Sequence, residues 1–128
     1  MRILLDTHVA LWAIADDTRL PTMAHGLILD GQNEIFVSTA SVWEIAIKHS
    51  LARRDMPVSG KQAAAWFQQA GYVLLSVSAT HAAAIEELPS LHADPFDRLI
   101  VAQALTEPLR LLTHDRTVAR YSDTIILI

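Results

Sequence analysis

The stretch MRILLDTHVALW, residues Met1–Trp12, decides the fold of this chain. Residues 3–5 (ILL) form a short apolar run that predicts a buried strand, and the apolar segment that begins at Val9 predicts a helix. Asp6 stands between the two, where the chain has to reverse. Because a carboxylate is costly to bury at the end of a fully apolar strand, Asp6 is the first candidate for a functional acid.

The same alternation of strand and helix continues along the chain. Short runs rich in Ile, Leu and Val predict five strands, at Ile3–Leu5, Glu34–Ser38, Tyr72–Val77, Leu109–Thr113 and Thr124–Ile128. Helices are predicted between them, at Val9–Ala15, Pro21–Leu29, Ala40–Arg53, Gly60–Gln69, Ala79–Glu87, Pro95–Leu105 and Arg116–Tyr121. Gly71 is the predicted C-terminal cap of the fourth helix. Strands without polar alternation are typical of a parallel sheet covered on both faces, which predicts an α/β fold with right-handed crossovers.

Length and composition limit the class of protein. The chain has 128 residues, which fits a single domain over residues 1–128, and 52% of them are hydrophobic. There is no cysteine, so disulfides and Cys-zinc sites are excluded and a cytoplasmic setting is expected. No apolar run approaches the roughly 20 residues of a membrane span, and no signal peptide is recognisable. The formal net charge of −4 differs from the strongly basic composition of most nucleic-acid binders.

Two acids follow predicted strands. Asp6 ends the first strand, and Asp115 in LLTHD ends the fourth. Ligands of open α/β sheets bind outside the carboxyl ends of the strands, so the two carboxylates face each other if these strands are neighbours. The alternative is that each acid caps the helix that follows it, since Asp is a favoured N-cap residue.

Two more acids lie within predicted helices. Glu44 in SVWEIAIK has apolar neighbours on nearly every side, which indicates a buried helix, although an i,i+4 pair with Lys48 is an alternative role. In DPFDRLIVAQA, Asp94 reads as the N-cap and Asp97 as an N3 acid. The apolar stripe shared by Asp97 with residues 101, 104 and 105 instead predicts that Asp97 points inward, toward the sheet edge.

Four acids are therefore expected to converge: Asp6, Glu44, Asp97 and Asp115. Carboxylates at close range repel one another unless some take up protons or a cation neutralises them. Oxygen ligands favour hard ions, so Mg²⁺ or Mn²⁺ is predicted, and the histidines show no zinc-binding spacing. A Mg²⁺ ion held by few carboxylates keeps water ligands and suits phosphoryl chemistry.

Four stretches together resemble the PIN-domain family, specifically VapC-type toxin ribonucleases of bacterial toxin–antitoxin pairs. They are LLDTHVALW, VSTASVWEIAIKHSLARRDMP, LPSLHADPFDRLIVAQA and LLTHDRTVARY, in this order. The resemblance implies a three-layer PIN-like domain with a parallel five-stranded sheet in the order 3-2-1-4-5. It also implies metal ligands at Asp6, Glu44 and Asp97, with Asp115 as a fourth acid. Ala52 departs from the Gly that many relatives carry there.

The resemblance implies a metal-dependent endoribonuclease toxin that hydrolyses RNA, a cognate antitoxin, a homodimer and no membrane association. Thr7 and Arg98 are the candidate substrate-binding residues. A receiver-like Mg²⁺-binding signalling domain is an alternative, but YVLLSVSAT lacks its acceptor acid. A haloacid-dehalogenase-like phosphatase needs a second Asp where His8 stands. A non-catalytic PIN-like binding module is the remaining alternative.

Overall fold

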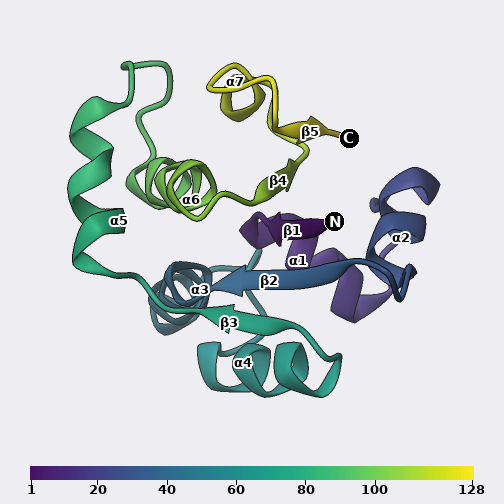
Figure 1. Cartoon of the computed structure of the whole chain (residues 1–128). Coiled ribbons are helices and arrows are strands. Elements are labelled where there is room, and N and C mark those ends of the chain that lie inside the picture. The colour runs from purple at the N-terminus through teal and green to yellow at the C-terminus, as the bar shows by residue number, and fades with distance from the viewer.

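The five strands form one parallel sheet in the order β3-β2-β1-β4-β5, which runs from bottom to top in Figure 1. This computed structural model describes residues 1–128. The strands are β1 (Arg2–Leu5), β2 (Glu34–Ser38), β3 (Val73–Leu75), β4 (Arg110–Thr113) and β5 (Ile126–Leu127). The order confirms the one implied by the resemblance. Because Leu5 of β1 pairs with Leu112 of β4, the two strands that carry Asp6 and Asp115 end side by side.

Helices cover both faces of the sheet and make the domain three-layered (Figure 1). They are α1 (Thr7–Ala15), α2 (Thr22–Leu29), α3 (Thr39–Ser50), α4 (Gly60–Gln69), α5 (Ala79–Ala84), the 3-10 turn η1 (Ile85–Glu87), α6 (Pro95–Thr106) and α7 (Arg116–Ala119). None of these helices is long and apolar enough to cross a membrane.

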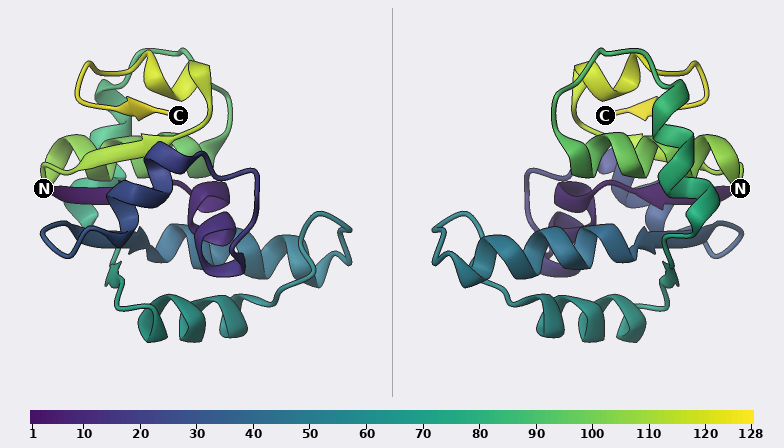
Figure 2. Two further views of the ribbon diagram at one scale, coloured as in Figure 1. Left: turned by 90° about the vertical axis from the view of Figure 1, so that its right-hand side faces the viewer. Right: turned by 90° about the vertical axis from the view of Figure 1, so that its left-hand side faces the viewer.

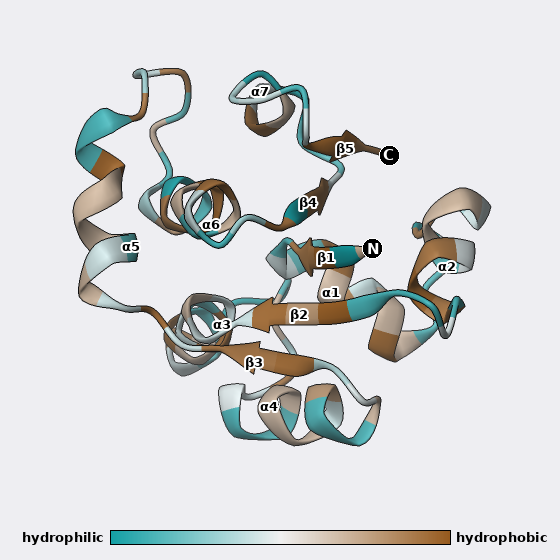
Figure 3. Cartoon of the chain, in the orientation of Figure 1, coloured by the Kyte–Doolittle hydropathy of each residue, from teal (hydrophilic) through white to brown (hydrophobic).

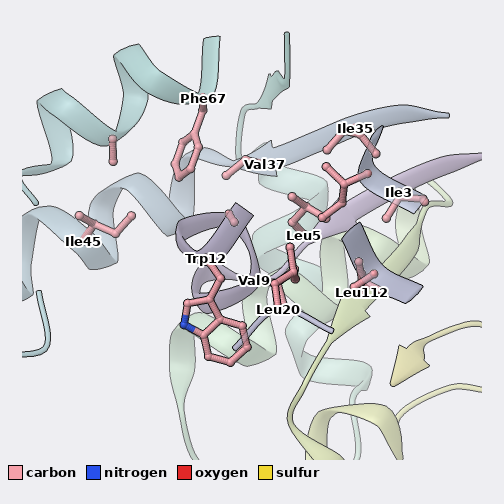
Figure 4. Close-up of a cluster of buried hydrophobic side chains, with 14 of the residues drawn as sticks. Ile3, Leu5, Val9, Trp12, Leu20, Ile35, Val37, Ile45, Phe67 and Leu112 are labelled. Carbon is pink, nitrogen blue, oxygen red and sulfur yellow. The ribbon is translucent and has the colours of Figure 1, made fainter. Parts of the chain in front are cut away.

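Neighbouring residues of the central strand enter two separate cores. Leu5 packs with α1 and α4, where Trp12 and Phe67 are buried in the same cluster (Figure 4). Leu4 points to the other face and packs with α6, where Ile100 is buried. Side chains alternate between the faces of a strand, so a strand covered on both faces has to be apolar at successive positions. Figure 3 shows the strands as hydrophobic over most of their length.

The predicted elements are confirmed, with shorter ends at the edges of the sheet. The predicted strands Tyr72–Val77 and Thr124–Ile128 reduce to β3 and β5, because each of these edge strands pairs with one neighbour alone. The helix predicted at Ala79–Glu87 splits into α5 and η1. The helix predicted at Ala40–Arg53 ends at Ser50.

A left-handed residue ends α3. Ala52 has a φ of 54°, its N–H donates to His49 O, and the N–H of Arg53 donates to Lys48 O. This is the Schellman arrangement, which usually carries Gly at this position. The turn therefore keeps the geometry suited to the family's Gly although it costs an Ala side chain about 1 kcal/mol of strain. Gly71 ends α4 in the same way, with a φ of 87°, as predicted.

Gly60 allows α3 and α4 to approach closely. The two helices run side by side in both views of Figure 2. A Cβ atom at Gly60 would lie 2.7 Å from Cβ of Ala46 and 3.0 Å from the carbonyl oxygen of Val42, both on α3. Because α3 also carries Glu44, this contact helps to place a candidate site residue.

Two glycine substitutions should change stability in opposite directions. Gly60→Ala should lower the free energy of unfolding by about 1–3 kcal/mol, because α3 and α4 have to separate. Gly26→Ala, inside α2, meets no atom within 4 Å and should raise it by about 0.5–1 kcal/mol. Urea denaturation of the three proteins measures both effects. A Gly60→Ala protein as stable as the parent would show that the helices separate without cost.

Candidate active site

The four predicted acids line one cavity of about 240 Å³ at the carboxyl ends of β1 and β4. Its full lining is Asp6, His8, Glu44, Lys48, Asp94, Asp97, His114 and Asp115. No apolar residue lines it. The helices α1, α3, α6 and α7 each begin at this end of the sheet, so their N-terminal halves and caps bring the acids together.

Asp6 is a helix cap and a member of the cavity at the same time. Its Oδ1 accepts a hydrogen bond from the N–H of Val9 at 2.9 Å, which caps α1. Its Oδ2 accepts one from the hydroxyl of Thr113 at 2.5 Å, which joins β1 to β4. Burial raises the pKa of Asp6, and these two hydrogen bonds, with His8 and His114 nearby, oppose the rise. Asp6 therefore caps α1 and also faces the cavity, so the capping interpretation does not exclude the functional one.

Glu44 is buried and holds two partners. Its Oε1 accepts a hydrogen bond from the hydroxyl of Thr7 at 2.8 Å, and its Oε2 lies 2.6 Å from Nζ of Lys48. The i,i+4 pair is thus present, but within the cavity and not on a solvated surface. Thr7 is 2% exposed and also contacts Ser41 at 2.9 Å. It was predicted to bind substrate, whereas its position fits a residue that orients Glu44.

Asp97 is the least compensated of the four acids. Its carboxylate accepts no hydrogen bond in the structure, and its one ion-pair contact is Nε2 of His92 at 3.4 Å. Burial raises the pKa of Asp97 to about 7, with further contributions from Asp94, Asp6 and Glu44. Asp94 caps α6 as predicted, because its Oδ1 accepts hydrogen bonds from the N–H groups of residues 96 and 97.

The apolar stripe predicted from Asp97 is partly wrong. Val101 and Ala104 are buried, but Leu105 is 41% exposed. It lies on the next turn and rotates away from the sheet, since α6 continues beyond the edge of the second core.

Asp115 caps a helix with one carboxylate oxygen and contacts His92 with the other. Its Oδ1 accepts hydrogen bonds from the N–H groups of Thr117 and Val118, which caps α7. Its Oδ2 lies 3.1 Å from Nε2 of His92. Burial raises the pKa of Asp115, but the hydrogen bonds from His92, Val118 and Thr117 outweigh it and hold the pKa below its ordinary value.

Arg98 lies away from the cavity. Its guanidinium donates to the carbonyl oxygens of Ile85 and Leu88, in and after η1, at 3.3 and 3.4 Å. Neither Glu44 nor Asp94 pairs with it. The prediction that Arg98 contacts RNA phosphate therefore lacks support from its position, because Arg98 does not line the acid cavity and its Nη2 donates to these two carbonyls.

Sequence reasoning missed two residues that contact the acids. Thr113 accepts a hydrogen bond from the N–H of Asp115 at 3.1 Å and donates to Asp6, and His92 contacts both Asp97 and Asp115. Thr113 stands two residues before Asp115, and this short spacing was the available signal. His92 lies in a loop, and no local pattern marked it.

The donor set fits a hard divalent cation. Carboxylates from Asp6, Glu44, Asp97 and Asp115 face a cavity of limited size, and burial disfavours the charge on two of them. A divalent cation bound by these oxygens neutralises the carboxylates and so offsets both their burial and their mutual repulsion. An N-capping role alone explains neither the raised pKa of Asp97 nor the buried Glu44.

Comparison with known proteins assigns the family. The family model of the PIN domain matches residues 3–123. The chain belongs to the PIN-domain family. It is 36% identical over 117 residues to ribonuclease VapC22 of Mycobacterium tuberculosis, a match that covers 89% of this chain and 87% of that protein. All five acids that line the cavity lie within the region that the PIN model matches.

Solved structures share the PIN fold over nearly the whole chain. VapBC2 of Rickettsia felis, bound to a DNA fragment from its promoter, has a TM-score of 0.69 and 20% identity over 100% of this chain and 98% of that chain. DNA-bound VapBC of Salmonella typhimurium has a TM-score of 0.68 and 14% identity over 100% and 97%. The FitAcB structure of Neisseria gonorrhoeae has a TM-score of 0.63 and 22% identity over 98% and 96%. At these identities the likeness shows the fold.

The raised pKa of Asp97 predicts how the metal-free protein responds to pH. The pKa of about 7 in the folded protein exceeds the ordinary value of 3.8, so folding takes up a proton between these values. The free energy of unfolding should therefore fall as the pH rises from about 4 to 7. Asp97→Asn removes the charge and should raise the free energy of unfolding by about 1–3 kcal/mol relative to the parent at pH 8 in EDTA. The difference should be smaller at pH 5.

Urea denaturation at the two pH values makes this comparison. Glu86→Gln is the matched control, because Glu86 is exposed in η1 and outside the cavity, and it should shift stability by less than about 0.5 kcal/mol. If Asp97→Asn were less stable than the parent at pH 8, Asp97 would act through the helix dipole instead.

Proposed function

We propose that this chain is a metal-dependent endoribonuclease and the toxin of a toxin–antitoxin pair. The observation that carries the proposal is the convergence of Asp6, Glu44, Asp97 and Asp115 on one cavity of a PIN domain. The 36% identity to a VapC ribonuclease supports RNA as the substrate class. Mg²⁺ or Mn²⁺ is the proposed ion, since all four side chains offer oxygen ligands.

In this mechanism Asp6, Glu44 and Asp97 hold the cation, and Asp115 assists. When bound, a divalent cation supplies an activated water and neutralises charge on the phosphodiester. The chain's own residues orient the ligands: Thr113 directs Asp6, and Thr7 with Lys48 directs Glu44. Preorganised ligands of this kind need little rearrangement during the reaction. Lys48 also adds a positive charge to the cavity wall, where it can contact a phosphate oxygen.

The receiver-like alternative fits the structure less well. Such a domain uses an acceptor acid after the third strand, and residues 76–80 (SVSAT), which follow β3, contain no acid. The non-catalytic binding module does not explain why the acids converge on one cavity. RNA cleavage by the purified chain separates both alternatives from the proposal.

Cleavage should require a hard cation of the right size. We expect the purified chain to cleave a pool of total RNA with Mg²⁺ or Mn²⁺, to lose this activity in EDTA, and to recover little of it with Ca²⁺, whose longer bonds misplace the reacting groups. Asp97→Asn should lower the rate by ~100-fold or more, the scale expected when a group that stabilises transition-state charge is lost. Glu86→Gln should cleave like the parent.

Gel analysis of the products over time measures these rates. Cleavage that persists at the parental rate in excess chelator would overturn the metal mechanism. A folded, Mg²⁺-binding chain that leaves the whole RNA pool intact would favour the binding module.

An antitoxin is the proposed partner. A groove of about 420 Å³ lies between α1 and the segment that joins α3 to α4, and its apolar lining includes Leu11, Trp12, Met56 and Trp66. His8 lines both this groove and the acid cavity, so a partner seated in the groove reaches the site. Structures named VapBC share this fold and support a toxin–antitoxin pair for this chain. A homodimer is part of the same proposal.

Expression of the chain alone should arrest bacterial growth. Asp97→Asn, made to the same level, should allow normal growth, because the acid cavity is the proposed cause of the toxicity. Colony counts after induction, with immunoblots for soluble protein, measure the effect. Normal growth of cells that contain folded parent protein would contradict the toxin assignment. Light scattering of the purified Asp97→Asn protein tests the homodimer.

A further inference from the structure

His92 contacts two of the acids, Asp97 and Asp115. It lies in the loop between η1 and α6. Its Nε2 is 3.1 Å from Oδ2 of Asp115 and 3.4 Å from Oδ2 of Asp97. The nitrogen and the two carboxylate oxygens all lie within 4.8 Å of one another. This grouping has two possible meanings: a nitrogen ligand for a metal, or a hydrogen-bond donor to the two acids.

The hydrogen bond of the other ring nitrogen, Nδ1, shows which of these two roles the ring is arranged for. Nδ1 of His92 accepts a hydrogen bond from the N–H of Asp94 at 3.0 Å. A nitrogen that accepts carries no proton, so Nε2 of the neutral ring carries it and donates. For Nε2 to ligate a metal, the proton would have to move to Nδ1, where it would face the N–H of Asp94 at hydrogen-bond distance. The ring is therefore arranged as a donor to the acids and not as a ligand.

The backbone and the ring of His92 each have an anchor. The backbone N–H of His92 donates to the hydroxyl of Tyr121 at 3.0 Å, which ties this loop to the residues after α7. The N–H of Asp94 fixes the ring plane. Asp94 itself caps α6, so the loop that presents His92 and the helix that presents Asp97 share one anchor.

His92 is the ionisable partner of Asp97 and the one side-chain donor to Asp115. The other acids have dedicated donors, since Thr113 serves Asp6 and Thr7 with Lys48 serves Glu44. We infer that His92 is a positioning residue, whose Nε2–H donates to Asp115 and, 3.4 Å from Oδ2 of Asp97, keeps both carboxylates in the orientation that receives the cation. Its effect on catalysis rests on the function proposed above.

Two substitutions at His92 distinguish the role of its Nε2–H donor from that of its Nδ1 acceptor. In His92→Gln the side-chain N–H reaches the position of Nε2 and still donates to the carboxylates. In His92→Asn the amide oxygen takes the place of Nδ1 and still accepts from the N–H of Asp94, but no donor reaches the acids. His25→Asn is the matched control, because His25 lies on α2, outside the cavity, and has no hydrogen-bond partner through its ring.

Mn²⁺ binding measured by calorimetry is the first readout. We expect His92→Asn to weaken the affinity by roughly 10-fold or more, the usual effect of losing a residue that orients a metal ligand. His92→Gln should recover most of that loss, and His25→Asn should bind like the parent. Equal losses in the Asn and Gln variants, or parental affinity in His92→Asn, would overturn the inference.

RNA cleavage at saturating Mn²⁺ is the second readout. His92→Asn should lower kcat and leave KM for RNA near the parental value, because the residue acts on the acids and not on the substrate. His92→Gln should restore most of kcat. A rise in KM with an unchanged kcat would show that His92 contacts RNA, which contradicts a positioning role.

A third readout needs no variant and covers the case in which a substitution prevents folding. The ¹⁵N spectrum of the parent's histidine rings should show His92 protonated at Nε2, both without metal and with saturating Mg²⁺. A proton that moves to Nδ1 when Mg²⁺ is added would make His92 a ligand and overturn the inference. If the parent fails to cleave RNA, the proposed function fails, but metal affinity and the ring tautomer still decide the role of His92.

Discussion

The burial of carboxylates at the end of the sheet, with their mutual repulsion added to it, is the constraint on which the rest of this structure depends. Asp6 has to sit where β1 meets β4, because α1 begins there. Glu44, Asp97 and Asp115 come to the same cavity from three other helices. Nearby donors offset part of this cost, since an acid is contacted by each of four residues: Thr113, Thr7, Lys48 and His92. Asp97 has the fewest donors, and its pKa is raised because they do not offset its burial and the neighbouring acids.

Helix capping and site formation turn out to be the same arrangement. Asp6 and Asp115 each give one oxygen to the N–H groups of a following helix and keep the other for the cavity. Parallel strands end at one edge, and the helices that follow them start there, so capping acids gather without any further device. An Asp at a strand end can therefore cap a helix and line the cavity together, which is why the two interpretations of Asp6 do not exclude each other.

Local patterns predicted most of the fold, because burial on both faces makes every central strand apolar and the caps mark where helices start. The order of the strands came from family resemblance, since nothing in an apolar run states which run lies beside it. The four acids were predictable from strand ends and helix faces. Thr113 and His92 were not predicted, because Thr113 reaches Asp6 across 107 positions and His92 lies in a loop without a local pattern that marks it. Leu105 was misplaced because a helical stripe does not say where the sheet ends.

The cavity's charge explains how an acidic chain is compatible with a polyanionic substrate. Four of the ten Lys and Arg residues pair with acids, among them Arg19 with Asp17 and Arg53 with Asp55. Arg98 lies outside the cavity, where its Nη2 donates to two carbonyl groups. Lys48 is the one Lys or Arg that lines the acid cavity, and Glu44 holds it. A phosphate therefore meets net negative charge in the metal-free cavity, and neutralisation of the carboxylates has to come first. Under the proposed function, the residues that orient the acids would therefore govern substrate approach as well, because they would govern how well a cation is held.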